Sequence, residues 1–271
     1  MRRSRTQRYL VTTVRDEQIG RAPDELVVEE PLTIQLDGVV VATTMRTPGH
    51  DFELAVGWCH TEGLLGGAGV TGIRYCGTGS AVDTEFNVVS VSTGGWAPEP
   101  TPRVGTTSSS CGICGSTAID DVGERLDPMT PTDVDWSVVP KVAAQVRHEQ
   151  ELFEATGAAH AAAAFRLAGG KVTLVREDIG RHNAVDKVVG RLLLDGALPA
   201  LIAGAEPMGL WVSGRASFEM VQKAWAGGFR ALVAVSAPSA LAVDLARRGN
   251  LALAGFARGD DVTVYTGRSD A

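Results

Sequence analysis

The chain has 271 residues, of which 44% are hydrophobic and 21% are charged, an ordinary balance for a globular protein of one or two domains. The formal net charge of -7 excludes general affinity for nucleic acid, so any anion site must be a local cluster of basic residues. The basic start is not followed by an apolar signal core, and no stretch approaches ~18 uninterrupted apolar residues, so neither a signal peptide nor a membrane span is expected.

The N-terminal part is predicted to form a smaller, β-rich α+β domain over residues 25–105, preceded by a polar, frayed segment at 1–24. Asp37-Gly38 between two apolar runs is a strong hairpin signal. Asp51 is expected to cap a helix after the Pro48-Gly49 turn. Strands are predicted at 26–28, 32–36, 39–43, 73–76 and 85–92. The segment 94–105, which has three prolines, is predicted to be a linker.

The stretch 107–115, TSSSCGICG, carries Cys111 and Cys114 at C-x-x-C spacing among small residues. No apolar periodicity crosses it, so a mobile loop is expected over 106–116. In such a pair, each sulfur can lower the pKa of the other or attack the adduct on the other. A structural disulfide, or a zinc site completed by a histidine such as His160, remains open as an alternative.

The other two cysteines have simpler surroundings, because Cys59 lies on an apolar helical face and Cys76 at a strand end. A packing role is predicted for both. Four cysteines without a secretory signal favour a reducing compartment, where a C-x-x-C pair is more often catalytic or metal-binding than a structural disulfide.

Residues 117–271 are predicted to form an α/β domain, a sheet covered by helices, because strands and helices alternate with short glycine-rich turns. Residues 133–167, including His160, are expected to be helical in more than one piece. Further helices are predicted at 183–194, 216–226 and 239–247. Strands are predicted at 171–175, 209–212, 231–235, 251–256 and 262–265.

Ligands of such sheets bind where strands end and helices begin, and three of these turns are unusually polar. The first turn, 176–183, places Arg181 and His182 at a helix N-terminus, which favours an anion. The alternative is that Glu177 and Asp178 pair with neighbouring arginines at the surface.

The second turn contains Ser213, Gly214 and Arg215, where the glycine would let a ligand approach the backbone and the arginine could bind phosphate. A plain N-cap serine beside a surface arginine is the alternative. The third turn consists of Phe256, Ala257, Arg258, Gly259, Asp260 and Asp261. Its arginine suits phosphate and its aspartates suit a guanine or a ribose hydroxyl, although a tight turn between two strands would have the same sequence. Together the three turns predict a site for a large phosphorylated ligand.

Zinc deaminases carry an H-x-E pair followed by P-C-x-x-C. Here the residues after His160 are alanines, no proline precedes the cysteines, and the order along the chain is reversed. Deaminase chemistry is therefore disfavoured.

Five motifs together resemble the FdhD family of formate dehydrogenase accessory sulfurtransferases, from about residue 25 to the end. They are RTPGHD at 46–51, CGICG at 111–115, EDIGRHNAVDK at 177–187, SGRASFEMVQK at 213–223 and GFARG at 255–259. The GRHNAVDK and SGR-x-S-x-E stretches are specific to the family, whereas the C-x-x-C pair alone is not. Thr156-Gly157-Ala158 and Thr263 depart from the family pattern, which leaves ligand details open.

The resemblance implies a cytoplasmic homodimer with a cytidine deaminase-like C-terminal domain, a mixed sheet covered by helices. It implies a carrier that takes sulfur as a persulfide from a cysteine desulfurase. The sulfur passes to the molybdenum cofactor, Mo-bis(molybdopterin guanine dinucleotide), before that cofactor enters formate dehydrogenase. The persulfide would form on Cys111 with Cys114 assisting, and residues 256–261 would contact the cofactor.

Arg181, His182 and Arg215 would neutralise the cofactor phosphates, together with Arg258. No permanent cofactor, metal, nucleic acid or membrane is expected to take part. The competing interpretation is a binding module that holds the cofactor, with zinc on the C-x-x-C pair and no sulfur transfer.

Overall fold

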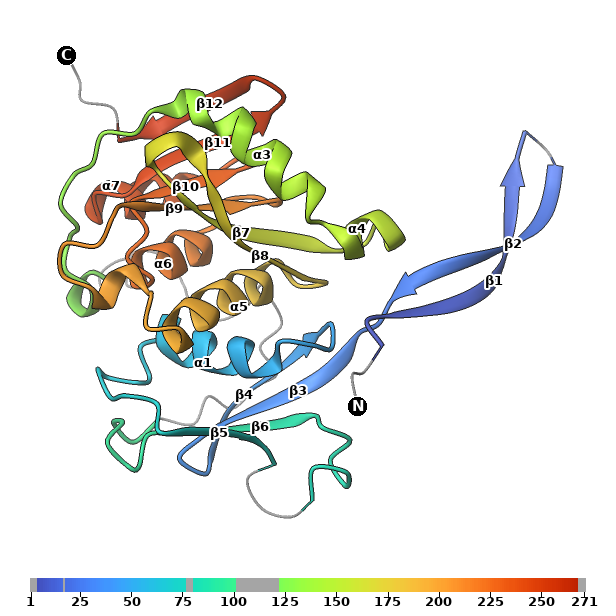
Figure 1. The fold of residues 1–271 in the computed structure, drawn as a ribbon, viewed down its shortest axis with the longest axis horizontal. Coiled ribbons are helices and arrows are strands. Elements are labelled where there is room, and N and C mark those ends of the chain that lie inside the picture. The colour runs from blue at the N-terminus through green and yellow to red at the C-terminus, as the bar shows by residue number, and fades with distance from the viewer. Residues whose placement is uncertain (1–3, 17, 77–79, 101–121, 268–271) are drawn as a thin grey trace.

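The computed structural model describes residues 4–16, 18–76, 80–100 and 122–267 of the chain (Figure 1). The loop predicted over 106–116, with Cys111 and Cys114, lies outside the described residues. Within the described ranges, the strands form a two-stranded ribbon, a four-stranded sheet and a six-stranded sheet. No helix in these ranges is long and apolar enough to cross a membrane.

The two-stranded ribbon consists of β1 (Thr6–Arg15) and β2 (Gln18–Val27), which pair antiparallel along their whole length. It projects from the rest of the molecule, as Figure 1 shows. The expectation of a frayed segment over 1–24 is therefore wrong for the residues in these strands. The β-branched and aromatic side chains of TQRYLVTTVR favour extended backbone, and cross-strand pairing supplies the hydrogen bonds.

The four-stranded sheet has the order β4-β3-β6-β5 and carries helix α1 (Asp51–Thr61). Its strands are β3 (Glu30–Leu36), β4 (Val39–Arg46), β5 (Gly72–Tyr75) and β6 (Val88–Ser92). The predicted hairpin is confirmed: Asp37 and Gly38 join β3 to β4 with φ values of 47° and 88°, the left-handed region that a tight two-residue turn requires. The core of this part packs the inner face of the sheet against α1.

Helix α1 begins at the predicted residue but is not capped as expected. His50 occupies the N-cap position at φ 58°, and no side chain caps the helix there. Asp51 is instead the first helical residue, and its carboxylate accepts two 3.0 Å hydrogen bonds from the guanidinium of Arg46. The aspartate therefore fixes α1 to β4, because a bidentate pair buried on both sides has one geometry.

The six-stranded sheet has the order β12-β11-β10-β9-β7-β8. Strands β9, β10 and β11 are parallel, whereas β7 and β12 run antiparallel to their neighbours, so the predicted mixed sheet is confirmed. The strands are β7 (His160–Arg166), β8 (Val172–Asp178), β9 (Met208–Val212), β10 (Ala231–Ala234), β11 (Ala252–Arg258) and β12 (Asp261–Thr266).

Helices cover both faces of this sheet (Figure 1). One face packs against α5 (Arg181–Leu194), α6 (Phe218–Ala226) and α7 (Ala240–Arg248). The other packs against α3 (Val139–His148), which α4 (Glu151–Thr156) follows. The short 3-10 segments are η1 (Trp136–Val138), η2 (Ala168–Gly170) and η3 (Pro199–Leu201).

The prediction of helix throughout 133–167 is wrong for its last part, because His160 begins strand β7. Ala161 and Ala163 point into the core beneath α3, while Ala162 and Ala164 point into the core beneath α5 and α6. Alanine favours helix when isolated. Here its small side chain lets helices approach a central strand from both faces, and this packing overrides the local preference.

Helices α1 and α5 cross closely and join the two larger sheets (Figure 1). Gly57 of α1 and Gly190 of α5 lie at the crossing, where a Cβ on Gly57 would overlap the Asp186 carbonyl and one on Gly190 would overlap the Glu53 carbonyl. Glycine is required at both positions because the backbones themselves are in contact.

Candidate functional site

The predicted polar turns lie at one edge of the six-stranded sheet, which we call the carboxyl edge because β9, β10 and β11 all end there. Strand β8 also ends at this edge and β7 begins there, since His160 pairs with Asp178. The amide of Ser236, after β10, donates to the Gly214 carbonyl at 3.2 Å, and the Phe256 amide donates to the Ser236 carbonyl at 3.3 Å. The second and third predicted turns are therefore held next to each other.

The first and second turns also meet. Ser213 accepts a 2.9 Å hydrogen bond on Oγ from the Ala161 amide, and the same oxygen lies 3.3 Å from His160 Nδ1. A Cβ at Gly214 would lie 3.5 Å from Arg181 and 3.7 Å from the His160 ring. The predicted residues of these turns thus surround a histidine that was expected on a helix.

His160 is partly buried within this group. Burial lowers the pKa of its imidazole, and the positive charges of Arg181 and His182 lower it further. The ring is therefore held toward its neutral form at pH 7, because charging it would cost both solvation and repulsion.

Arg181 and His182 are the first two residues of α5, with Gly180 at the N-cap. His182 Nε2 lies 3.9 Å from a carboxylate oxygen of Glu219 in the first turn of α6, and the His182 ring is the largest influence that holds the pKa of Glu219 at about 2. Two helix N-termini therefore meet here, and such ends attract anions.

Unpaired polar atoms gather at the same edge. In the part of the chain that the structure describes, the buried side-chain nitrogen and oxygen atoms without a hydrogen-bond partner are Arg181 Nε, His182 Nε2, Trp211 Nε1 and Ser217 Oγ. A buried donor without a partner costs about 1–3 kcal/mol, so such atoms are rare in a folded protein. Their concentration at the carboxyl edge indicates groups that a ligand would satisfy.

Trp211 and Ser217 were not singled out from the sequence. Trp211 belongs to an apolar strand, and Ser217 precedes α6 as an ordinary N-cap serine would. Only the SGR-x-S-x-E spacing drew attention to Ser217, and no signal in the sequence marked Trp211.

The remaining predicted residues are more exposed. Arg215 is exposed beyond Gly214, and Gly259, Asp260 and Asp261 lie exposed at the turn from β11 to β12. Gly259 has a φ of 58°, as the alternative of a tight turn required. The two aspartates therefore occupy solvent-facing turn positions, whereas Ala257 is 4% exposed and Arg258 Nε donates to the Val235 carbonyl at 3.1 Å.

Phe256 has an unusual conformation for an aromatic residue. Its φ is 53°, in the left-handed region that side chains other than glycine rarely adopt, and its side chain is 43% exposed. A strained backbone with an exposed ring next to Arg258 is a feature that packing alone does not require.

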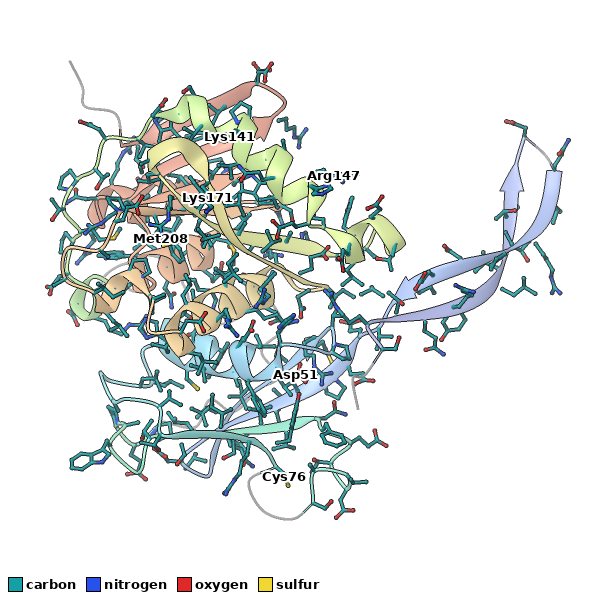
Figure 2. All side chains as sticks on the ribbon, viewed as in Figure 1. Asp51, Cys76, Lys141, Arg147, Lys171 and Met208 are labelled. Carbon is teal, nitrogen blue, oxygen red and sulfur yellow. The ribbon has the colours of Figure 1, made fainter. Side chains whose placement is uncertain are left out.

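A pocket of about 510 Å³ opens at the carboxyl edge on the face covered by α3. We call it the aromatic pocket; its lining includes Gln150, Phe153, His160, Trp211, Ser213 and Arg258. The guanidinium of Arg147 lies 5.0 Å from the centre of the Phe153 ring. Figure 2 shows Arg147 at the end of α3 nearest α4.

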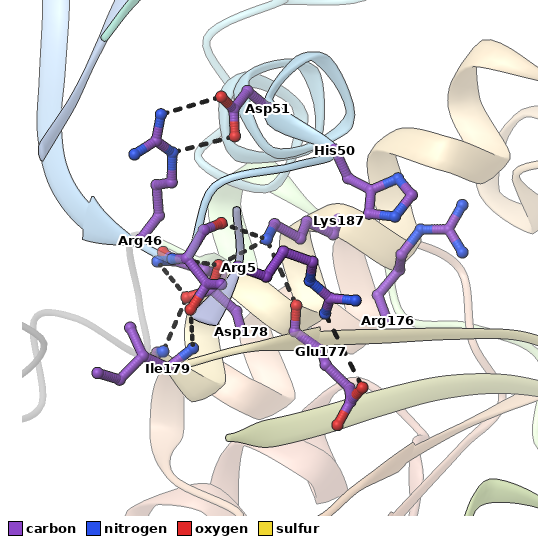
Figure 3. A network of polar contacts seen from close by, with 12 residues as sticks. Arg5, Arg46, His50, Asp51, Arg176, Glu177, Asp178, Ile179 and Lys187 are labelled. Carbon is purple, nitrogen blue, oxygen red and sulfur yellow. Dashed lines mark hydrogen bonds and ion pairs between the residues drawn. The ribbon is translucent and has the colours of Figure 1, made fainter. Parts of the chain in front are cut away.

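Glu177 and Asp178 do not form the surface pairs that were considered for them, because they are 4% and 0% exposed. Glu177 accepts hydrogen bonds of 2.8 Å from the amides of Leu152 and Phe153 at the start of α4, and Arg5 lies 3.8 Å away. Asp178 lies 2.6 Å from Lys187 Nζ (Figure 3). These carboxylates therefore hold α4 and α5 at the carboxyl edge.

The described cysteines are poor candidates for thiol chemistry. Cys59 is 0% exposed, and burial, together with the negative charge of Asp186, raises the pKa of its thiol to about 12. Cys76 is 5% exposed and lies by the four-stranded sheet, far from Arg147 in Figure 2. Among the described residues, no group of three or more His, Cys, Asp and Glu side chains is arranged to hold a metal ion.

Comparison with known proteins gives consistent matches. A sequence model of the FdhD/NarQ family matches residues 27–270. The Sulfur carrier protein FdhD of Streptomyces avermitilis is 46% identical over 272 residues, covering 97% of this chain and 94% of the relative. The protein of that name from Mycolicibacterium paratuberculosis is 44% identical over 269 residues, covering 96% and 97%.

Among solved structures, a formate dehydrogenase accessory protein from Desulfotalea psychrophila matches with a TM-score of 0.75 and 20% identity, covering 98% of this chain and 99% of that one. At this identity the match shows a shared fold. A guanine deaminase from Nitrosomonas europaea matches 56% of this chain with a TM-score of 0.33.

Proposed function

The chain belongs to the FdhD/NarQ family, and from this membership we propose that it is the sulfur carrier that prepares the molybdenum cofactor for formate dehydrogenase. The observation that carries the proposal is identity of 44–46%, over nearly the whole chain, to relatives named Sulfur carrier protein FdhD. The sulfur donor is a cysteine desulfurase, and the cargo is Mo-bis(molybdopterin guanine dinucleotide). The predicted compartment is the cytoplasm, and the predicted assembly is a homodimer.

In the first step, the Cys111 thiolate attacks the terminal sulfur of the persulfide on the desulfurase. The sulfur–sulfur bond of the donor breaks, the donor cysteine leaves as a thiolate, and Cys111 becomes the persulfide. Cys59 is excluded as the sulfur acceptor, because a fully buried thiol with a pKa of about 12 is neither ionised nor reachable at pH 7. This exclusion supports the choice of Cys111. Cys114 assists in one of two ways. Its thiolate takes the terminal sulfur and leaves Cys111 as a thiolate, or it attacks the inner sulfur, which forms a Cys111–Cys114 disulfide and releases the terminal sulfur at the sulfide level to the cargo.

The carboxyl edge is the proposed cargo site. Arg181, His182 and Arg215 bind the cofactor phosphates, with Ser213 and Gly214 allowing close approach to the backbone. The unpaired Arg181 Nε supports this assignment, because a phosphate oxygen would accept its hydrogen bond. The turn from Phe256 to Asp261, which includes Ala257, Arg258, Gly259 and Asp260, supplies the remaining contacts.

Glu219 restricts where the anion lies. Its carboxylate stays ionised far below neutral pH and lies beside His182. A second negative group at that position would be repelled. The phosphates are therefore expected on the side of Arg181 and Ser213, and His182 then bridges them to Glu219.

The test is mass spectrometry of the intact protein and its peptides after incubation with an active cysteine desulfurase and free cysteine, without reductant. We expect a gain of one sulfur atom on Cys111 that a reductant removes. Cys114→Ser is the matched control, since it should still be loaded, whereas Cys111→Ser should gain no sulfur at any cysteine.

Absence of any sulfur gain, from a desulfurase shown to load another acceptor, would overturn the carrier role. The binding module would then be the better interpretation, and it predicts stoichiometric zinc that survives dialysis with thiols that resist alkylation.

A further inference from the structure

The ribbon of β1 and β2 presents apolar side chains to water. Leu10, Val14 and Ile19 are 65%, 69% and 78% exposed. The strand register places Leu10 opposite Pro23 and Val14 opposite Ile19. Because paired residues share a face and side chains alternate along a strand, these four residues lie on one face of the ribbon, which we call the arm face. The ribbon projects from residues 28–267, which we call the body (Figure 1).

The arm face is expected to be covered in the working protein. A two-stranded ribbon by itself is only marginally stable in water, since it has no second layer on which to bury apolar side chains. Single exposed apolar residues are ordinary, but two cross-strand apolar pairs on one face of a projecting ribbon mark an interaction surface. The partner must therefore lay a surface along the ribbon.

The base of the ribbon is fixed to the body. The Val28 amide donates to the Arg5 carbonyl at 2.9 Å, and Thr6 Oγ1 donates to the Glu25 carboxylate. The Arg5 guanidinium lies 3.8 Å from the Glu177 carboxylate, and β2 packs against α4. The ribbon therefore leaves the body as an arm of fixed direction and not as a loose tail.

The size of the ribbon decides between possible partners. Two strands of 10 residues, at about 3.4 Å per residue and about 4.8 Å between strands, give a face of about 340 Å². One ribbon laid on an unrelated protein, or two ribbons laid on each other, would bury about 700 Å² in total, below the ~1,200 Å² at which stable interfaces begin. Two copies that each lay a ribbon on the body of the other bury about 1,400 Å², which reaches the range of stable interfaces.

Charge also favours the body of a second copy. Residues 1–27 contain six basic and four acidic residues, a formal net charge of +2, which leaves -9 for the rest of the chain. Arg8 and Arg21 lie on the arm face itself, since they are paired with Glu25 and Thr12 in register with the apolar pairs. A basic arm and an acidic body attract each other, and the arm points away from the body of its own copy (Figure 1).

We propose that the arm face is an interface with a second copy of this chain, in which each copy lays its ribbon on the body of the other around a two-fold axis. Such an exchange is closed, because the same pair of surfaces is used twice. The inference rests on the homodimer predicted above and gives that assembly an interface. It does not depend on the sulfur chemistry.

The first test is sedimentation velocity of the full chain and of two variants over a range of protein concentrations. Leu10→Asp places a carboxylate on the arm face and should weaken the dimer at least about tenfold, because the charge loses water and faces an acidic body. Thr13→Asp is the matched control, since it changes the same strand on the opposite face and should leave the dimer as it is. Any loss of strand propensity is common to both variants.

Cross-linking tests where the ribbon lies in the dimer. The variant Ile19→p-benzoylphenylalanine carries a photoreactive group on the arm face, and isotope-labelled and unlabelled copies are mixed and allowed to exchange. Peptide mass spectrometry then separates links between copies from links within one copy. We expect links from the ribbon of one copy to residues 28–267 of the other.

A monomeric parent, a dimer that Leu10→Asp leaves unchanged, or a dimer that Thr13→Asp weakens equally would each overturn the inference. Links confined to one copy, or joining only the two ribbons, would do the same. Persulfide loading separates this result from the proposed function. A monomer that gains sulfur keeps the carrier role and loses the ribbon exchange, whereas a mapped exchange in a chain that never gains sulfur does the reverse.

Discussion

The ammonium group of Lys223 lies 2.9 Å from each carboxylate oxygen of Asp186, and neither side chain is more than 4% exposed. The lysine comes from α6 and the aspartate from α5, and Thr61 of α1 contacts both: its Oγ1 donates to Asp186 at 2.8 Å and accepts from Lys223 at 2.9 Å. One buried pair therefore joins three helices that carry the two larger sheets. The family-like stretches GRHNAVDK and SGRASFEMVQK each supply one of its charges.

Lys223→Met should destabilise the protein by about 3–5 kcal/mol, because it leaves Asp186 charged and buried without its partner. Urea unfolding followed by circular dichroism measures the change. Glu206→Gln is the control: it removes the partner of Arg166 from an ion pair in which both side chains are more than 40% exposed, and should cost at most about 1 kcal/mol. An unchanged urea midpoint for Lys223→Met would show that the buried pair does not stabilise this fold.

Gly57→Ala should destabilise the fold by more than about 3 kcal/mol, because a methyl group there overlaps the Asp186 carbonyl in the backbone of α5. The helices α1 and α5 cannot separate without losing the core on both sides. Thermal unfolding measures the effect. Gly69→Ala is the matched control, since a Cβ at that position has nothing within 4 Å, and its melting temperature should stay near that of the parent. Equal melting temperatures for both variants would contradict the close crossing.

Arg176→Gln should lower the stability of the protein at neutral pH and make that stability less dependent on pH in acid. Burial raises the pKa of Glu53, but the side chains of His50 and Arg176 outweigh this and hold it at about 2. Because the folded-state pKa lies below the ordinary 4.5, Glu53 contributes stability that is complete above pH 4.5 and is lost as the pH falls toward 2. The contribution is on the order of 3 kcal/mol.

The measurement for Arg176→Gln is the free energy of unfolding between pH 2 and pH 7. In both proteins the loss should begin near pH 4.5, the ordinary pKa of the carboxyl, but in the variant it should end at a higher pH and be smaller than in the parent. Identical pH profiles for the two proteins would show that Arg176 does not set the ionisation of Glu53.

Cys59 should resist iodoacetamide at pH 7.5 in the folded protein and react only after unfolding in urea. Its thiol is fully buried, and its pKa of about 12 leaves almost no thiolate at that pH. Peptide mass spectrometry assigns the modified cysteine. Alkylation of Cys59 at the same rate in native and in unfolded protein would contradict its burial and reopen it as a sulfur acceptor.

Local patterns were sufficient for much of the fold. Strand β9 and the turn at Asp37-Gly38 were predicted near their observed positions, because apolar runs bounded by turn residues carry their own signal. The alanine run of β7 was mistaken for helix because the preference of alanine is local, whereas the helices that bury it from two faces are not. The ribbon of β1 and β2 was missed for a different reason: its strands are neighbours in the chain, but most of their side chains are exposed and show no core-facing apolar pattern.

In the candidate site too, some residues could be predicted from local sequence and others only from the tertiary structure. Arg181, Ser213 and Gly214 were predicted from their place at strand ends, and the fold brings them together. Trp211 was missed, since an unpaired indole N–H can be recognised only when every neighbour is known. Glu177 and Asp178 were noted in the sequence as part of a polar turn, but their burial was not predicted.

By itself, the sequence determined the mixed α/β class, the polar turns at strand ends and the C-x-x-C pair, because each depends on residues near one another in the chain. Only the tertiary structure decided that the turns share one sheet edge, that His160 lies among them on a strand, and that Lys223 pairs with Asp186. These depend on strand order and helix crossing, which bring together residues far apart in sequence and remove them from water.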